Sequence, residues 1–306
     1  MIRTHLLEKT ASLSIVRTAA SAPAPQPPEA VPQRNGLLAA LPASELAMWQ
    51  SSLERVRVNA GQVLLEADVA AHHAYFPVDA VISLVCTTEE GGCTEVAVIG
   101  REGMVGVGLF IGGSAGAGQA IVQCSGQAFR IRASVLREHF NRSAAVRDNL
   151  LRYLQSLLVQ SAQMAVCNRH HTVQQQLCRW LLSALDRVDG HELPMTQELI
   201  ATTLGVRRAG ITEAITQLRK LDLVRCRRGR IAVPDRRRLE QHACGCYAHL
   251  RAQFRQLLPA AGRTSVLGVT VPAAHRAAAA PAGELHLGTG VTSAKRVAGA
   301  RSLIAK

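Results

Sequence analysis

Aromatic residues are scarce in this sequence, and several motifs typical of catalytic, metal-binding and phosphate-binding sites are missing. Aromatics make up 3% of the 306 residues, so the cores must be built from Leu, Val, Ile and Ala. The eight cysteines are scattered without a CxxC pair or an evident secretory signal, which favours free thiols in a reducing cytoplasm. The chain also lacks a phosphate-cradling GxxxxGK[ST] motif and any recognisable nucleophile–base arrangement. We therefore expect a protein that is not an enzyme.

Charge is absent from residues 103–129, a segment long enough to span a bilayer. Eight of its 27 residues are glycine, and polar side chains such as Gln119 and Ser125 interrupt the remainder. A spanning helix needs a sustained apolar surface. We therefore predict turns and buried strands here, and no membrane segment.

Basic residues are concentrated toward the C-terminus. Residues 35–167 carry 9 basic and 11 acidic residues, whereas residues 168–258 carry 16 basic and 8 acidic residues, and the whole chain has a net charge of +13. A slightly acidic body joined to a strongly basic segment is typical of a sensing part linked to a polyanion-binding part. A basic surface that only keeps the chain soluble is the alternative.

The two ends of the chain have compositions that disfavour folded structure. Residues 21–32 hold five prolines, so residues 1–34 are predicted to be a disordered arm with a proline-rich linker. Residues 259–306 are rich in Ala, Gly, Val and Thr without a steady period, and are predicted to be a disordered basic tail.

Short apolar runs separated by turn signals predict strands in residues 62–66, 80–87, 94–99 and 119–131. Many short strands at this spacing indicate an antiparallel β-roll of jelly-roll type over residues 35–143. The fold class predicted for the whole chain is α+β, with this roll followed by a long helix and a DNA-binding domain.

Residues 144–168 form a helical pattern without Pro or Gly. Apolar and small residues recur at spacings of four and three, as in the seam of a short coiled coil. We predict a dimerisation helix with the seam Leu150, Leu154, Leu157, Ser161 and Met164. The alternative is a helix packed on its own sheet.

The basic segment, residues 169–258, contains the pattern of a winged helix-turn-helix. Thr196 can cap a starting helix, Glu198 favours the positive end of that helix, and Gly205 suits the turn that ends it. A second helix from about Arg207 to Leu221 buries its apolar side. Two short strands joined by Arg227-Arg228-Gly229 follow as a wing.

The start of the second helix is the part that a recognition helix presents to base edges in the major groove. An arginine there can bind guanine with two hydrogen bonds, whereas cations at a wing tip suit phosphate. The predicted partner is double-stranded DNA. The predicted contact residues are Thr196, Gln197, Arg207, Arg208, Ala209, Thr212, Glu213, Arg227, Arg228 and Arg230.

From about Leu37 to Leu258 the sequence resembles regulators of the Crp/Fnr family. The motifs that carry the resemblance are Ala60-Gly61-Gln62, Tyr75-Phe76-Pro77, the run from Val98 to Met104, and Thr196-Gln197-Glu198 through Leu204-Gly205. The resemblance implies a cyclic-nucleotide-binding-like β-roll, a long dimerisation helix and a winged helix-turn-helix. It also implies a homodimer on a roughly palindromic operator, with RNA polymerase as a candidate further partner.

The resemblance places an effector pocket at Gly100, Glu102 and Gly103, but the family's phosphate-binding Arg-Ser pair is missing. No arginine follows until Arg130, and residues 112–115 read Gly-Gly-Ser-Ala. A buried cyclic phosphate would lack a cationic partner there, so we predict that cyclic AMP is not the effector.

No metal site and no cofactor are predicted. The family's iron–sulfur sensors have a cysteine cluster near the N-terminus, whereas the first cysteine here is Cys86. The pair Cys244 and Cys246 supplies only two ligands, so free thiols near a C-terminal helix are favoured over a redox-active or metal-binding pair.

Overall fold

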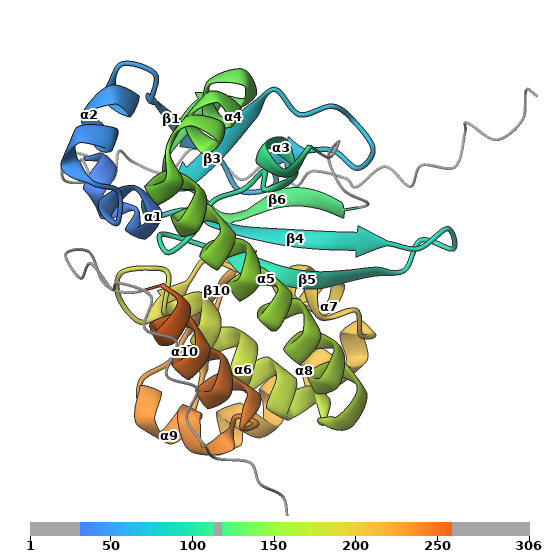
Figure 1. Ribbon diagram of the computed structural model, residues 1–306. Coiled ribbons are helices and arrows are strands. Elements are labelled where there is room, and N and C mark those ends of the chain that lie inside the picture. Colours follow the sequence, from blue (N-terminus) through green and yellow to red (C-terminus); the bar gives the residue numbers. More distant parts are fainter. Residues whose placement is uncertain (1–30, 113–117, 259–306) are drawn as a thin grey trace, which may run out of the picture. The chain divides into compact units, whose positions relative to one another are not determined.

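The computed structural model describes residues 31–112 and 118–258 (Figure 1). Residues 1–30 of the arm predicted at 1–34 and the predicted tail at 259–306 lie outside the described residues, as do Gly113, Ser114 and Ala115. The last residues of the predicted arm are not disordered, because Pro32–Arg34 form a short 3-10 helix. The division of the chain into domains stays a prediction, and the elements are described here in chain order.

A buried asparagine ties the first helices to the β-roll. These helices are η1 (Pro32–Arg34), α1 (Gly36–Ala39) and α2 (Ala43–Gln50). The Asn35 side-chain oxygen accepts hydrogen bonds from the amides of Leu37 and Leu38, which begin α1. Its Nδ2 donates to the carbonyl oxygens of Pro77 and Gly103, both at 2.8 Å. One buried side chain thus caps a helix and fixes it to two loops of the roll.

Two antiparallel sheets form the predicted roll. The first has the order β1 (Glu54–Val58), β7 (Gly126–Arg132) and β3 (His73–Pro77). The second has the order β2 (Val63–Leu65), β6 (Gly118–Cys124), β4 (Val81–Thr87) and β5 (Cys93–Ile99). The long apolar run predicted at 119–131 is two strands separated at Ser125, and β1 and β3 were not predicted. Their alternating or short apolar patterns gave a weaker signal.

A short helix, α3 (Gly108–Ile111), lies between β5 and β6. After β7 the chain forms α4 (Ala133–Arg142) and then the predicted long helix, α5 (Ala144–His170). Ser143 caps α5 by accepting a hydrogen bond from the amide of Val146. The 27 residues of α5 correspond to a length of about 40 Å. It packs on β5 and on α10 (Cys246–Leu257) (Figure 1).

The predicted seam of α5 is largely wrong, because most of it is buried within the same chain. Leu150 and Leu157 belong to the core of the roll, and Met164 is also buried. The Ser161 hydroxyl donates to the carbonyl oxygen of Val96 at 3.1 Å. Among the apolar residues of the predicted seam, only Leu154 is partly exposed to solvent. The helix therefore packs on its own sheet through these residues, which was the alternative interpretation of the same periodicity.

The C-terminal part forms a second core, which also includes Val81, Val98 and Cys124 of the roll. The helices are α6 (Val173–Leu185), α7 (Gln197–Leu204), α8 (Arg208–Lys220), α9 (Arg236–His242) and α10. A small antiparallel sheet has the order β8 (Glu192–Leu193), β10 (Arg230–Ala232) and β9 (Arg225–Arg227). The core is built mainly from Leu and Ile, with Trp180 as its largest apolar side chain. The few aromatics of the chain are concentrated in the core of the roll, which includes Trp49, Phe76, Phe110, Phe129 and Tyr153.

No helix among residues 31–112 and 118–258 combines the length and apolar character needed to cross a bilayer.

Candidate DNA-binding surface

The helix-turn-helix begins and turns where the sequence predicts. Thr196 caps α7, and its Oγ1 accepts a hydrogen bond from the amide of Leu199 at 3.2 Å. Gly205 ends the helix with φ of +66°, in the left-handed region that glycine adopts readily. A side chain at position 205 would also collide with Thr94 of β5. The glycine is therefore required both by the turn and by the contact with the roll.

Helix α8 has one buried and one exposed face. Ile211, Ala214, Ile215 and Leu218 are buried, and they hold the helix on the C-terminal core. Arg208, Ala209, Thr212 and Glu213 are exposed and border a shallow groove that continues to Lys220. The helix therefore presents its polar N-terminal face to solvent, as a recognition helix must.

Two contacts join the exposed face of α8 to the first turn of α7. Arg208 Nε lies 3.3 Å from a carboxylate oxygen of Glu198, and both side chains are about two-thirds exposed. The Thr212 hydroxyl donates to the side-chain oxygen of Gln197 at 3.0 Å. Gln197 was among the predicted contact residues, and Glu198 was predicted to favour the start of α7. These contacts orient Arg208 and Thr212 without burying them.

The wing is formed by β9, β10 and the two residues between them. Arg227 pairs with Arg230 across the hairpin, which leaves Arg228 and Gly229 as the tip. Gly229 has φ of +69°, as a tight two-residue turn requires. Arg230 lies 3.7 Å from Glu192 of β8, whereas Arg227 and Arg228 are exposed. Arg225, which was not predicted, adds a further exposed cation to β9.

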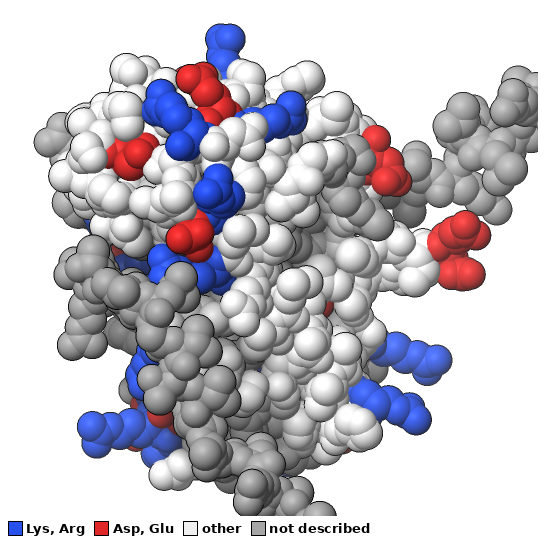
Figure 2. All heavy atoms as spheres, viewed as in Figure 1, with Lys and Arg blue, Asp and Glu red and all other residues white. Residues whose placement is uncertain are grey.

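Figure 2 shows how charge is distributed on one face of the molecule. At the right edge of this view, acidic side chains project from the upper part and basic side chains from the lower part. This agrees with the excess of basic residues in 168–258 over the near-neutral segment 35–167.

The residues predicted as an effector pocket have mainly packing roles. A Cβ at Gly103 would lie 2.5 Å from Tyr153, and a Cβ at Gly100 would lie 2.6 Å from Arg187. Both glycines therefore permit close approach, of α5 in one case and of the segment after α6 in the other. Glu102, the third predicted residue, lines a cavity.

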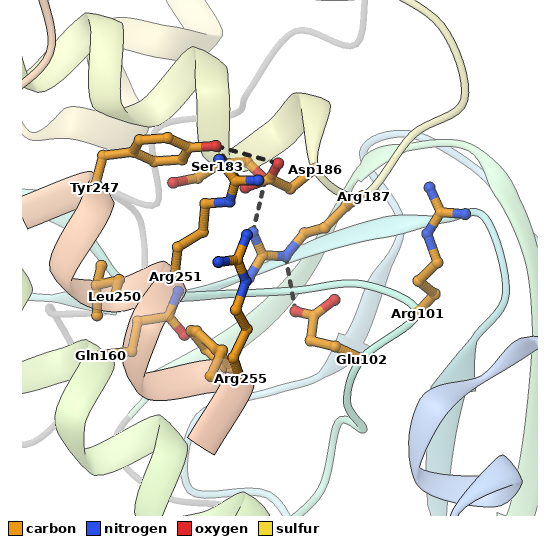
Figure 3. A pocket seen from close by; sticks show the side chains of 11 residues that line it. Arg101, Glu102, Gln160, Ser183, Asp186, Arg187, Tyr247, Leu250, Arg251 and Arg255 are labelled. Carbon is orange, nitrogen blue, oxygen red and sulfur yellow. Dashed lines mark hydrogen bonds and ion pairs between the residues drawn. The ribbon is translucent and has the colours of Figure 1, made fainter. Parts of the chain in front are cut away.

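That cavity has a volume of about 350 Å³ and lies between the roll, α6 and α10 (Figure 3). Glu102 Oε1 accepts from Arg187 Nε at 2.8 Å, and Arg187 also donates to the carbonyl oxygen of Ser183. The Arg187 side chain is 7% exposed, so its charge depends on these partners. Figure 3 shows Arg251 and Arg255 of α10 beside this pair. The three arginines were not predicted, because they lie 85 or more residues after Glu102.

A second buried carboxyl group lies between the roll and α6. Glu95 of β5 is 1% exposed and accepts a hydrogen bond from the Ser83 hydroxyl. Burial raises the pKa of Glu95 to about 6, although Ser83, Arg179, Trp180 and Arg187 all favour the ionised form. Desolvation thus outweighs the neighbouring charges at this site.

One family model matches part of the chain, and solved structures of similar fold include transcription regulators. Residues 175–242 match the Crp-like helix-turn-helix domain, and this range holds most of α6 together with α7, α8, the wing and α9. A transcriptional regulator of the CRP/FNR family from Thermus thermophilus has a similar fold, with a TM-score of 0.51 at 19% identity. The match covers 62% of this chain and 98% of that one.

Two further solved structures are similar in fold. FixK2 from Bradyrhizobium japonicum has a TM-score of 0.54 at 16% identity, over 63% of this chain and 98% of that one. The regulator CLP from Xanthomonas campestris, described as responsive to c-di-GMP, has a TM-score of 0.52 at 16% identity, over 63% and 99%. No curated protein sequence matches the chain. The resemblance predicted from the motifs is confirmed: residues 175–242 match the Crp-like helix-turn-helix domain, and the chain is similar in fold to solved structures of Crp/Fnr-family regulators.

Proposed function

We propose that this protein is a transcription regulator that binds a specific DNA operator through α8 and the wing. The observation that supports this most is the exposed N-terminal face of α8 beside the arginines of the wing, within a Crp-like domain. Arg208, Ala209, Thr212 and Glu213 would read base edges, since these residues begin the recognition helix. Thr196, Gln197, Arg207, Arg227, Arg228 and Arg230 would contact the DNA around them, mainly at phosphates.

We propose that the chain acts as a homodimer through a stripe of α5 that differs from the predicted seam. Leu151, Leu158 and Val166 are 42%, 64% and 50% exposed, and large apolar side chains in such a row are costly in water. Together with Leu154, Ala162 and Ala165 they lie on one side of the helix, opposite its buried face. Two copies joined along this stripe would present two α8 helices to successive major grooves of a roughly two-fold operator.

We propose that a signal received by the roll reaches the DNA-binding domain through the ion pair of Glu102 and Arg187. The pair joins the loop after β5 to the segment after α6, and the cavity beside it carries several arginines. An anionic ligand could compete there with Glu102 for the guanidinium groups. That cyclic AMP is not the effector stays a prediction, since residues 113–115 lie outside the described residues. Calorimetry that finds micromolar binding of cyclic AMP, lost in Glu102→Ala, would contradict it.

The remaining expectations concern partners and location. RNA polymerase is a candidate partner for a regulator of this fold, and the cytoplasm is the compartment that we propose. All eight cysteines lie within the described residues and none is in a disulfide, which supports a reducing environment.

The experiment that tests the function is selection of genomic DNA fragments by the purified full chain, followed by competition. We expect one fragment to be retained against an excess of scrambled DNA, with affinity falling steeply as salt rises. Equal competition by scrambled DNA would instead indicate a structural DNA-binding protein without sequence choice. The absence of any retention at low salt would contradict DNA binding altogether.

A further inference from the structure

Four potential metal ligands converge where α5 ends. Cys167 belongs to the last turn of α5, and His171 directly follows that helix. Cys244 and Cys246 come from the junction of α9 and α10. One ligand atom from each residue lies within 4.8 Å of all the others. The set joins two segments that are more than 70 residues apart in the sequence.

Two of the six distances between these atoms match a tetrahedral site for one ion, and all six are at most 4.8 Å. Sγ of Cys167 lies 3.5 Å from Sγ of Cys244, and Sγ of Cys246 lies 3.6 Å from Nδ1 of His171. Zinc bonds of about 2.3 Å to sulfur and 2.0 Å to nitrogen place tetrahedral ligand atoms about 3.5–3.8 Å apart. An iron–sulfur cluster would need ligands spread around several irons. The four atoms therefore surround a space that fits a single ion.

We propose that Cys167, His171, Cys244 and Cys246 bind one Zn²⁺ ion. Three cysteines and one histidine are a ligand set of structural zinc sites, in which no coordination position is left for a substrate. The three cysteines are at most 5% exposed, so the ion would be shielded from solvent. Its role is to hold the end of α5 to the α9–α10 junction.

The surroundings supply the charge and the hydrogen bond that such a site needs. Zn²⁺ with three thiolates carries one net negative charge, and buried charge requires a partner. Arg179 is 1% exposed, and its Nε and one terminal nitrogen have no hydrogen-bond partner among the described residues. Arg179 lies close enough to Cys167 to stabilise negative charge on its sulfur. Gln163 Nε2 donates to Sγ of Cys246 at 3.0 Å, as outer partners of metal ligands do.

Without an ion, the three cysteines would be either neutral thiols or partly joined in a disulfide. Three buried neutral thiols would offer Arg179 no negative charge, and the carboxyl group of Glu95 would then be left to balance it. A disulfide between Cys167 and Cys244 would leave Cys246 and His171 without a shared partner, although their ligand atoms lie within 4.8 Å of those of the two bonded cysteines. A zinc ion satisfies all four ligands and Arg179 together.

The sequence prediction of no metal site is revised by this proposal. Cys244 and Cys246 were set aside because two ligands do not make a site. Two more ligands come from the end of α5, and nothing in the sequence indicates that this end meets the α9–α10 junction. The only local signal was the two-residue spacing of the cysteines.

The test uses the full chain purified under reducing conditions from zinc-containing medium. We expect elemental analysis to find about one zinc ion per chain. After zinc is removed, Co²⁺ should bind and give the strong sulfur-to-cobalt charge-transfer absorption of tetrahedral thiolate sites. Wild-type protein that holds no zinc and gives no such absorption would overturn the proposal.

Variants assign the site to these residues. Cys244→Ser with Cys246→Ser should lose the bound zinc, and His171→Gln should shift the visible bands of Co²⁺ because one nitrogen ligand is gone. His170→Gln, at an adjacent exposed histidine, and Cys86→Ser, in β4, are matched controls that should keep both metal content and spectrum. Circular dichroism identifies a variant that fails to fold, and the wild-type measurement then still decides. Equal cobalt spectra in wild type and the double variant, or a Cys167–Cys244 disulfide in the freshly purified chain, would overturn the proposal.

Discussion

Replacing Arg208 with alanine should reduce sequence-specific binding to the operator far more than non-specific affinity for DNA. Arg208 is the first residue of α8, where a guanidinium group reaches a base edge. Loss of a bidentate contact to a base costs about 1–3 kcal/mol, which corresponds to an operator affinity roughly 5- to 160-fold weaker. We expect the preference at one base pair to relax, and the affinity for scrambled DNA to change much less.

The structure indicates that this substitution leaves folding almost unchanged. The Arg208 side chain is 70% exposed, and its ion pair with Glu198 involves a carboxylate that is 65% exposed. Exposed pairs of this kind contribute about 0–1 kcal/mol to stability. The position of α8 is fixed by its buried apolar residues, which the substitution does not touch. A loss of affinity would therefore report on DNA contact and not on unfolding.

The matched variant is Arg228→Ala, at the tip of the wing. Arg228 is exposed in a two-residue turn, and phosphates are its nearer target on a duplex. We expect operator and scrambled DNA to be weakened alike, with the slope of log affinity against log salt smaller by about one.

The assay is fluorescence anisotropy with operator and scrambled duplexes at several salt concentrations, for wild type and both variants. The reasoning is refuted if Arg208→Ala weakens both duplexes equally while Arg228→Ala alters sequence preference. That result would mean that the wing, and not the start of α8, enters the major groove.

The other predictions concern the dimer and the buried ion pairs. Leu151→Lys with Leu158→Lys should give a monomer in sedimentation and a weaker operator complex, whereas the control Gln50→Lys, at an exposed position of α2 away from the stripe, should remain a dimer; an unchanged double variant would exclude the stripe. Glu102→Ala should lower the free energy of unfolding by about 1–3 kcal/mol because Arg187 loses its partner, and denaturant titration showing no loss would contradict this. The raised pKa of Glu95 means that the folded chain keeps a proton that the unfolded chain releases, so stability should fall as pH rises from about 4.5 to about 6. Glu95→Gln should remove that fall in unfolding curves, and a fall of the same size in the variant would assign it elsewhere.

The helix-turn-helix could be predicted from sequence because its determinants are local. A capping threonine at 196, a left-handed glycine at 205 and a buried face on α8 all act within a few residues. Strand β1 was missed because Arg55 and Arg57 face solvent, so its apolar alternation is short.

The packing of α5 and the surroundings of Cys244 could not be predicted, for another reason. Helical periodicity identifies which residues share a face, but not whether that face meets the same chain or a second copy. Leu150 and Leu158 both belong to apolar stripes, and only the packing of the roll shows which stripe is occupied. Likewise, the approach of His171 to Cys246 depends on how α10 packs on α5, which no local pattern encodes.

The length of α5 has a mechanical consequence. One end of the helix is buried in the roll through Leu150, and the other end carries Cys167 beside the DNA-binding domain. A tilt of about 5° at one end of a rod about 40 Å long moves the other end by about 3.5 Å. That displacement is about the rise of one base pair along DNA. As a lever, α5 would convert a change too small to disturb the packing of the roll into a full step of misalignment between protein and operator.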